Sequence, residues 1–449
     1  MTTREILERM ERRQSAMYVR RQRLKGRSVR QSIRLLFVWI GGRVRPVVIW
    51  FAASAHVAAP LPWRALFKLA IPLWVTTRLL ALLITYVSQT LLRASVIQSP
   101  RRGVITLDSL VNSWRLWDGG FYGHLVRTGY TRPIDAGFWP LYPLLSKPLE
   151  LLLGDDRWQI SLLITSNVAT LLAFVALGAL AVQEDETLGA ASRAMRLLAA
   201  APLALFLIAA YSDSLFLALA TAMPLCARRG QWRAAALWAF LAALSRPVGV
   251  VLIIPLLWEY ARQAKLPMNW RRPNTWLPTF VPLAGAVPAS IGLFSLYCFR
   301  IYNDPVAWIH AEALFNHLAM APWSAIGYAW QQVWHLQPAS FQQTRVLVDY
   351  LPLVFVAGFT FITIRRIPAS FTLYLVGLLL VCVMSPIVGA QFPEAFVSAG
   401  RYLLAAVPVY LILARAIRRV PWLDILLIGG GFAMQALLMA FVLTGGWLV

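Results

Sequence analysis

Long apolar runs dominate this sequence and constrain its fold more than any other feature. Several of them reach the ~20 consecutive apolar residues that a helix needs to cross the hydrocarbon core of a bilayer. Of the 449 residues, 59% are hydrophobic and 14% are charged, whereas a soluble domain carries about 25% charged residues. These properties exclude a soluble enzyme, a secreted disulfide-rich domain and a disordered chain. The sequence predicts an all-α polytopic membrane protein.

Eleven segments are predicted as transmembrane helices, and basic clusters set their direction. The segments are residues 66–92, 160–182, 197–210, 214–227, 234–245, 249–261, 276–300, 346–364, 370–389, 401–415 and 422–443. Basic residues gather at 228–233, 262–272, 365–366 and 415–419, which all share the side of the membrane that holds the N-terminus. Because positive residues concentrate in cytoplasmic loops, we predict a multi-pass protein of the cell membrane with a cytoplasmic N-terminus.

Residues 1–64 form a separate region in this interpretation. The first 46 residues carry 13 Lys/Arg and 3 Asp/Glu, without the apolar core and cleavage site of a signal peptide. A basic segment ahead of the first span is typical of a cytoplasmic tail on anionic lipid, and residues 47–62 are expected at the interface. Although the net charge is +23, we expect no nucleic-acid partner. Residues 65–449 are expected to form the transmembrane domain that holds the candidate functional residues.

Two apolar regions, 197–227 and 234–261, are too long for one span and short for two. Each has a polar break at its middle: Tyr211-Ser212-Asp213-Ser214 and Ser245-Arg246-Pro247. Because non-helical backbone inside a bilayer is tolerated where it lines a cavity, we expect two elbows that open to the non-cytoplasmic side. An ionisable residue within a span is a functional-site hypothesis, which applies to Asp213 and Arg246. A structural ion pair between them is the alternative.

The first outer loop, 93–159, is the richest in candidate functional side chains. A stripe at steps of three and four residues predicts one helix lying flat in the headgroup layer; its members are Trp114, Trp117, Phe121 and Leu125. Asp118 and Tyr122 lie one turn apart on a neighbouring face of this helix. The alternative is an interfacial aromatic belt with one solvated aspartate.

Four further charged residues are candidates for the site, and three of them have two interpretations. Arg401 begins the tenth segment on the outer side, where it would bind a phosphate or extend to the headgroups. Asp304 opens the second outer loop and Glu394 lies in the last one; each faces either the same cavity or water. Arg78 lies within the first segment, so the hypothesis for charges inside a span applies to it too.

The sequence indicates no metal site. The three cysteines lie in apolar stretches without metal-binding or disulfide spacing, and the outer histidines are too widely spaced for zinc. The acidic run Glu184-Asp185-Glu186 is expected on the cytoplasmic side, away from the outer cavity. No cofactor is certain from the sequence, and a divalent cation stays open.

Seven peptides occur in an order that resembles a known family. They are WDGGFYG (117–123), GY (129–130), FWPLYPLL (138–145), AAYSDSLFLAL (209–219), LSRPVGV (244–250), NDPVAW (303–308) and SAGRYLLAAVPVYLILA (398–414). The order resembles the PIG-V-like mannosyltransferases, bacterial relatives of the second GPI mannosyltransferase in the GT-C superfamily, over roughly residues 65–415. Trp139 stands where the family more often has a second Phe, and Asp213 where it more often has Glu.

The resemblance implies a GT-C-like bundle of about eleven transmembrane helices with amphipathic helices in the first outer loop. It implies inverting transfer of a mannose from a polyprenyl-phosphate donor to a glycolipid, glycan or protein acceptor on the outer face. Asp118 would be the general base, because inverting transfer needs one carboxylate at the acceptor hydroxyl. Arg246 and Arg401 would bind the donor phosphate. The candidate substrate-binding residues are Trp117, Tyr122, His124, Trp139, Tyr142, Asp213 and Asp304.

Other functions stay open on the sequence alone. A lipid or polysaccharide transporter or flippase also places its sites at broken helices, but it predicts internal repeats, which we do not find. A catalytically silent membrane scaffold would lose nothing on Asp118→Asn. Within the superfamily, an enzyme that uses another lipid-linked sugar is the nearest alternative. In every case membrane lipids are partners.

Overall fold

The computed structural model describes residues 60–92, 106–115, 117–185, 187–264, 273–315, 320–338, 340–384, 395–444 and 446. Within these ranges, residues up to 364 and from 369 onward form one compact unit. Most of the predicted N-terminal tail and Glu394 lie outside the described residues, so the division at residue 64 stays a prediction.

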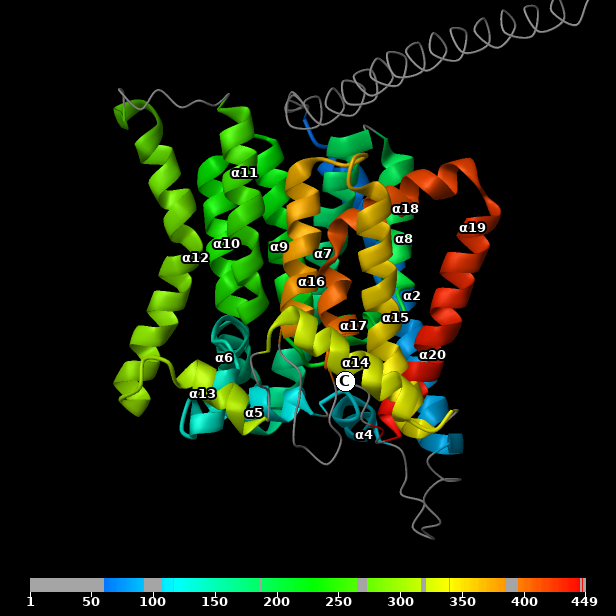
Figure 1. Ribbon diagram of the computed structural model, residues 1–449. Helices are drawn as coiled ribbons and strands as arrows, with labels where there is room; N and C mark the ends of the chain where they lie inside the picture. The colour runs from blue at the N-terminus through cyan, green and yellow to red at the C-terminus, as the bar shows by residue number, and fades with distance from the viewer. Residues whose placement is uncertain are drawn as a thin grey trace, which may run out of the picture. The chain divides into compact units, whose positions relative to one another are not determined.

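The described chain is all-α, as predicted, and these ranges contain no strand (Figure 1). Its α-helices are α2 Trp63–Val87, α4 Leu107–Asn112, α5 Asp118–Thr128, α6 Leu141–Leu153, α7 Trp158–Asp185, α8 Leu188–Ala199, α9 Asp213–Arg228, α10 Trp232–Ser245, α11 Ile253–Gln263, α12 Pro273–Tyr302, α13 Ala307–Leu314, α14 Pro322–His335, α15 Phe341–Thr363, α16 Ala369–Met384, α17 Ala399–Tyr402, α18 Val407–Arg419, α19 Trp422–Asp424 and α20 Gly430–Leu443.

Five helical stretches in the described ranges are long and apolar enough to cross a membrane. They are Trp63–Leu91, Asp155–Asp185, Trp276–Tyr302, Phe341–Thr363 and Trp422–Leu443. A sixth is counted if Ala399–Ala405 and Val407–Arg419, bent by 70° at their junction, form one broken span. The chain is therefore a multi-pass membrane protein, and the predicted count of eleven spans is not confirmed.

The predicted span over 197–210 is wrong. Helix α8 begins nine residues earlier, at Leu188, and ends at Ala199, after which residues 200–212 form turns and one short 3-10 helix, Ala204–Leu207. Pro202 has no backbone N–H to continue a helix. Helix α8 was missed because Arg193 and Arg196 lower the hydropathy of its sequence. The guanidinium groups of these arginines bond to Ala414 O (2.8 Å) and Asp424 (3.0 Å), respectively.

The two predicted polar breaks are confirmed as helix ends. Helix α9 begins at Asp213, and α10 ends at Ser245, where Arg246 adopts an extended backbone before a 3-10 turn, Pro247–Leu252, leads into α11. Gly249 is required at this turn, because a Cβ atom there would lie 2.5 Å from Ala243 Cα. We call residues 200–212 the first elbow and residues 246–252 the second elbow.

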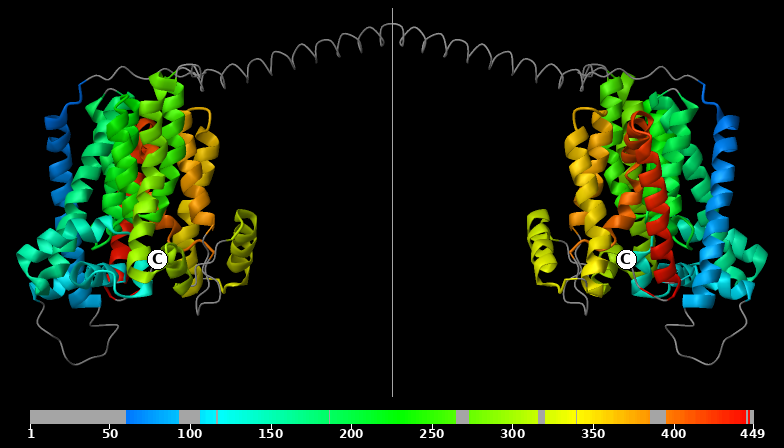
Figure 2. Two further views of the ribbon diagram at one scale, coloured as in Figure 1. Left: turned by 90° about the vertical axis from the view of Figure 1, so that its left-hand side faces the viewer. Right: turned by 90° about the vertical axis from the view of Figure 1, so that its right-hand side faces the viewer.

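The short outer-loop helices gather at one end of the long helices (Figure 1). They are α4, α5, α6, α13, α14 and α17, and the side views in Figure 2 agree with this placement. The connections from α7 to α8 and from α9 to α10 lie at the opposite end, as do the arginine-bearing ends of α11 and α18. The short outer-loop helices and the basic connections thus lie at opposite ends of the long helices, as the charge pattern predicts. Which end is cytoplasmic stays a prediction.

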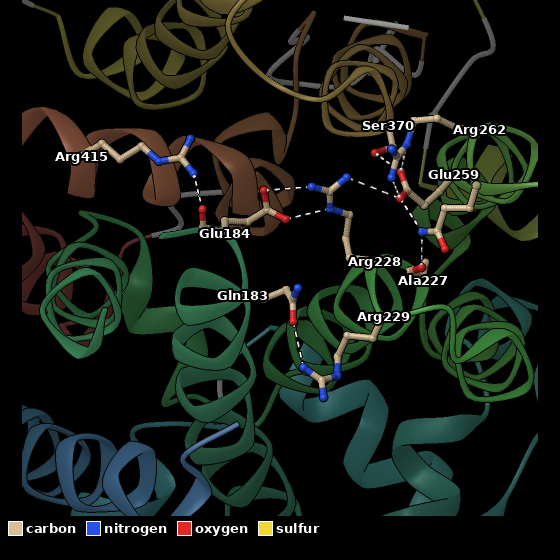
Figure 3. Close-up of polar contacts among 10 residues, drawn as sticks. Gln183, Glu184, Ala227, Arg228, Arg229, Glu259, Arg262, Ser370 and Arg415 are labelled. Atoms are coloured by element: carbon tan, nitrogen blue, oxygen red, sulfur yellow. Dashed lines mark hydrogen bonds and ion pairs between the residues drawn. The ribbon is translucent and has the colours of Figure 1, made fainter. Parts of the chain in front are cut away.

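Ion pairs and a hydrogen bond join five helices at the arginine-bearing end (Figure 3), and the pairs that involve Arg228 and Glu259 are buried. Arg228 of α9 binds Glu184 of α7 through Nε (2.7 Å) and Glu259 of α11 through NH1 (3.4 Å). Glu259 also binds Arg262 and accepts a hydrogen bond from Ser370 of α16 (3.0 Å), and Arg415 of α18 binds Asp185 (2.5 Å). Because buried charges are costly unless mutually satisfied, these contacts fix where the five helices meet.

Candidate active site

Arg401 brings together two aspartates that the sequence marks as candidates. Its Nε atom lies 3.0 and 2.9 Å from the two carboxylate oxygens of Asp213, and its NH2 atom lies 2.5 Å from Asp118 Oδ2. The three residues come from α17, α9 and α5, which are far apart in the sequence. Arg401 is 5% exposed, so the alternative that it extends to the lipid headgroups is wrong.

Arg246 completes this group by contacting the carboxylate of Asp213 as well. Its NH1 atom lies 2.6 Å from Asp213 Oδ1, an ion pair that is not aligned as a hydrogen bond. We call Asp118, Asp213, Arg246 and Arg401 the charged cluster; its formal charges sum to zero. The side chain of Asp118 is 29% exposed, against 5% for Asp213 and Arg401. Asp118 is therefore the most exposed member of the charged cluster.

Aromatic rings cover both guanidinium groups of the charged cluster. Arg401 Cζ lies 4.6 Å from the centroid of the Tyr211 ring and 5.3 Å from that of Phe206. Arg246 Cζ lies 4.9 Å from the centroid of the Tyr402 ring. Rings at this range attract cations through their quadrupole. These three rings were missed from the sequence, although Tyr402 directly follows Arg401 and Tyr211 lies two residues before Asp213.

A helix break at Trp117, rather than one continuous helix, positions Asp118. The predicted helix from Trp114 to Leu125 is wrong: α4 ends at Asn112 and α5 begins at Asp118, with Trp117 at φ +59° between them. A positive φ is strained for a residue with a bulky side chain. The first elbow anchors this break, because Ala210 N donates a hydrogen bond to Trp114 O (3.1 Å).

Helix starts position the two acidic members of the cluster. Asp118 and Asp213 each lie in the first turn of their helix, where the helix dipole favours a negative charge. Arg401 follows Ser398, at φ +60°, and Gly400, whose N–H donates to Asp349 Oδ1 (2.7 Å).

Tyr122 and Tyr142 connect the outer loop to the first elbow. The Tyr122 hydroxyl donates to Ser212 Oγ (2.7 Å), one residue before Asp213. Burial raises the pKa of Tyr122 well above its usual value, and the neighbouring Arg246 opposes this only in part. Tyr142 shares a hydrogen bond with Ser166 Oγ (2.7 Å), and that hydroxyl donates to Tyr211 O (2.9 Å). Both tyrosines therefore act here as neutral hydrogen-bonding groups.

The remaining predicted site residues lie outside the charged cluster. Trp117 is 45% exposed beside Asp118, whereas Trp139 is 3% exposed and packs against the Phe294 ring, centroid to centroid 5.0 Å. His124 contacts Asp135 (3.4 Å) instead of the cluster. Asp304 pairs with His310 (2.7 Å) at the start of the second outer loop.

Arg78 contacts the first elbow rather than the cluster itself. Its Nε donates to Asn167 Oδ1 (2.7 Å) and its NH2 to Leu207 O (3.1 Å). The same carbonyl accepts hydrogen bonds from the Thr170 and Ser214 hydroxyls. These bonds satisfy a carbonyl group at the end of the short 3-10 helix, which has no α-helical partner. Within a bilayer such a backbone group must be satisfied inside the protein.

No group of three or more His, Cys, Asp or Glu that could hold a metal ion occurs in the part of the chain that the structure describes. Glu184 and Asp185 of the acidic run bind arginines instead.

No protein-family model and no curated protein sequence matches this chain. It is similar in structure to ArnT from Cupriavidus metallidurans, crystallised with undecaprenyl phosphate: TM-score 0.44 and 13% identity over 82% of this chain and 75% of ArnT. An oligosaccharyltransferase from Archaeoglobus fulgidus gives TM-score 0.37 and 13% identity over 82% of this chain. The chain spans about half (52%) of that enzyme. At this level of identity and similarity, neither structure indicates the substrate or the mechanism of this chain.

Proposed function

We propose that the chain is a membrane glycosyltransferase with a GT-C-like fold, which moves mannose from a polyprenyl-phosphate donor to an acceptor on the non-cytoplasmic face. The observation that carries the proposal is the bridge that Arg401 makes between Asp118 and Asp213, with Arg246 on the same carboxylate. Four residues from separate peptides of the resemblance meet in one cluster. It lies towards the end of the long helices that holds the outer-loop helices.

The reaction needs one base, and Asp118 has the position for it. The acceptor hydroxyl oxygen bonds to the anomeric carbon of the donor while the bond from that carbon to the phosphate oxygen breaks. The hydroxyl proton passes to the carboxylate of Asp118, and the polyprenyl phosphate leaves with the electron pair. Attack from the side opposite the phosphate inverts the anomeric centre. Asp118 suits this role because its side chain is the most exposed carboxylate of the cluster.

Arg246 and Arg401 supply the positive charge for the leaving phosphate. Before substrate arrives, Asp118 and Asp213 neutralise both guanidinium groups. When Asp118 accepts the proton, its negative charge is lost and the cluster gains a net positive charge beside Arg401. That change coincides with the negative charge that develops on the phosphate, so the cluster stabilises the products.

The test is sugar transfer from labelled polyprenyl-phosphate mannose in membranes, with wild type and Asp118→Asn at matched expression. Removing a general base is expected to lower the rate at least about a hundredfold. Asp108→Asn is the control, because Asp108 is an exposed outer-loop aspartate in the first turn of α4. It is expected to keep wild-type activity.

Two results would contradict parts of the proposal. Full activity of Asp118→Asn would exclude Asp118 as the base and leave Asp213 as the next carboxylate to test. Transfer from another lipid-linked sugar, with none from the mannose donor, would exclude mannose and keep the enzyme class. Purified protein that transfers none of the lipid-linked sugars to the lipid or peptide acceptors of its own membranes would overturn the proposal.

A further inference from the structure

Helix α14 has three chemically distinct faces. Ala325 and Ala329 are buried, at 0% and 4% exposure, and mark the face that α14 turns to the protein; α14 packs against α16. A second face holds four exposed apolar side chains: Trp323 (77%), Ile326 (55%), Trp330 (66%) and Trp334 (68%). We call these four residues the tryptophan face. The third face is polar and exposed, with Ser324, Gln331 and His335.

Hydrogen bonds place α14 alongside the bundle rather than beyond its end. Gln332 Oε1 accepts from the Tyr350 hydroxyl of α15 (2.9 Å) and from Ala395 N (3.1 Å). Tyr350 lies nine residues after Phe341, the first residue of α15, which is about 14 Å along the helix. At the start of α14, Met320 N donates to Met384 O at the end of α16 (3.0 Å). The last turn of α14 thus lies level with the interior of a membrane-spanning helix.

Helix α15 indicates where the bilayer lies along this side of the bundle. It has 23 residues and is apolar enough to cross a membrane, and its length of about 34 Å matches a hydrocarbon core of about 30 Å. Its exposed side chains beside Tyr350 are apolar: Leu351 (62%), Val354 (68%) and Phe355 (50%). An exposed apolar surface on a membrane-spanning helix is the surface that contacts lipid chains. The last turn of α14, which includes Trp334, lies within its range of depth.

We propose that the tryptophan face of α14 is inserted into the bilayer leaflet on the side of the charged cluster, with lipid chains as its partner. Trp favours the boundary between acyl chains and headgroups, and a helix with an apolar and a polar face lies at that boundary. Helix α14 contains no Lys, Arg, Asp or Glu. Its polar face, with Ser324, Gln331 and His335, is turned to the headgroups. This inference does not depend on the proposed function.

Adjacent positions on α14 give a matched test. The full-length chain is prepared as Trp330→Cys and Gln331→Cys, labelled with a nitroxide and reconstituted in phosphatidylcholine–phosphatidylglycerol vesicles. Collision rates with oxygen, which concentrates in lipid, and with a water-soluble nickel chelate are then measured by electron paramagnetic resonance. Val354→Cys serves as the lipid-facing reference. Unsubstituted protein is the blank, because Cys226, Cys298 and Cys382 are buried.

The label at position 330 is expected to collide with oxygen at least about threefold more often than with the nickel chelate, as the label at 354 does. The label at 331 is expected to show the reverse preference. Equal access of nickel to 330 and 331 would overturn the proposal, because the tryptophan face would then lie in water. Spin–spin broadening at 330, absent at 354, would also overturn it and indicate a second copy of the chain on this face.

Discussion

At the scale of single residues, the sequence identifies the members of the charged cluster but not their contacts. Arg401 was a candidate because it begins a predicted span, and Asp118, Asp213 and Arg246 were each proposed from their local sequence alone. Nothing in the sequence pairs Arg401 with both aspartates, because the pairing arises only when α5, α9 and α17 meet. The covering rings of Tyr211 and Tyr402 were missed for the same reason.

Asp135 is a residue whose pH dependence can be predicted. Burial alone would raise the pKa of its carboxyl group, but hydrogen bonds from the Arg132 side chain and from the N–H groups of Arg132 and Thr131 outweigh it and lower that pKa. A lowered pKa stabilises the fold above the ordinary Asp pKa of about 3.9. That stabilisation is lost as the pH falls through the lower pKa of the folded state.

Asp135→Asn is therefore expected to lower the thermal unfolding midpoint at pH 7 and to approach wild type as the pH falls below about 4. The measurement is thermal unfolding of detergent-solubilised protein between pH 3 and pH 8. Asp108→Asn is again the control, and its difference from wild type is expected to stay small at every pH. A deficit of Asp135→Asn that is the same at pH 3 and pH 7 would argue against the ionised carboxylate as the cause.

At the scale of elements, helix ends were predicted well where polar residues interrupt an apolar run and poorly elsewhere. The ends at Asp213 and Ser245 follow directly from such interruptions. Residues 200–210 are apolar throughout, so hydropathy alone predicts a helix that Pro202 and the contacts of Leu207 O prevent. The helix break at Trp117 has no sequence signal, because tryptophan rarely adopts a positive φ.

Packing of α5 against α7 gives a paired prediction on two glycines. A Cβ atom at Gly123 would lie 2.1 Å from Trp158 Cζ3, whereas one at Gly120 would meet nothing within 4 Å. The Trp158 ring has little freedom to move, since the guanidinium of Arg127 stacks on it at 5.3 Å. Gly123→Ala is thus expected to destabilise the protein by about 1–3 kcal/mol, and Gly120→Ala to stabilise it by up to about 1 kcal/mol.

Thermal unfolding midpoints of the two glycine variants and wild type, measured in the same detergent, check this pair. We expect the highest unfolding midpoint for Gly120→Ala, an intermediate one for wild type and the lowest for Gly123→Ala. If both alanines shifted the midpoint by the same amount, helix propensity rather than contact with Trp158 would explain the effect.

At the scale of the whole unit, the candidate site and the buried ion pairs lie at opposite ends of the same helices. Asp213 begins α9 and Arg228 ends it, while the chain from Arg246 through α11 leads to Glu259. The hydropathy and charge of the sequence were enough to predict an all-α membrane protein with its large loops on one side. They were not enough to predict the number of spans, because several helices are shorter than a bilayer is thick.

Glu259→Gln tests whether the distant ion pairs support the site. It leaves Arg228 and Arg262 without one carboxylate in a buried position, and breaking a buried pair costs about 3–5 kcal/mol. We expect a lower thermal unfolding midpoint and reduced sugar transfer. The variant loosens the contact between the ends of α9 and α11, and a shift of either helix moves Asp213, which begins α9, or Arg246, which precedes the second elbow. Asp156→Asn, at an exposed aspartate, is the control. An unchanged midpoint would show that these ion pairs do not stabilise the fold.

The two elbows also have a consequence for how the orientation of this protein is determined experimentally. Arg228, at the end of α9, meets Glu184, just before α8 begins, and Gln263, at the end of α11, bonds to Ala227 O. Each pair of short helices therefore returns to the end from which it started, and so forms a hairpin with no net crossing. Reporter tags inserted at residues 186, 230 and 264 should all report the same compartment. A topology map built from such tags would count neither hairpin, and it would still orient every later helix correctly.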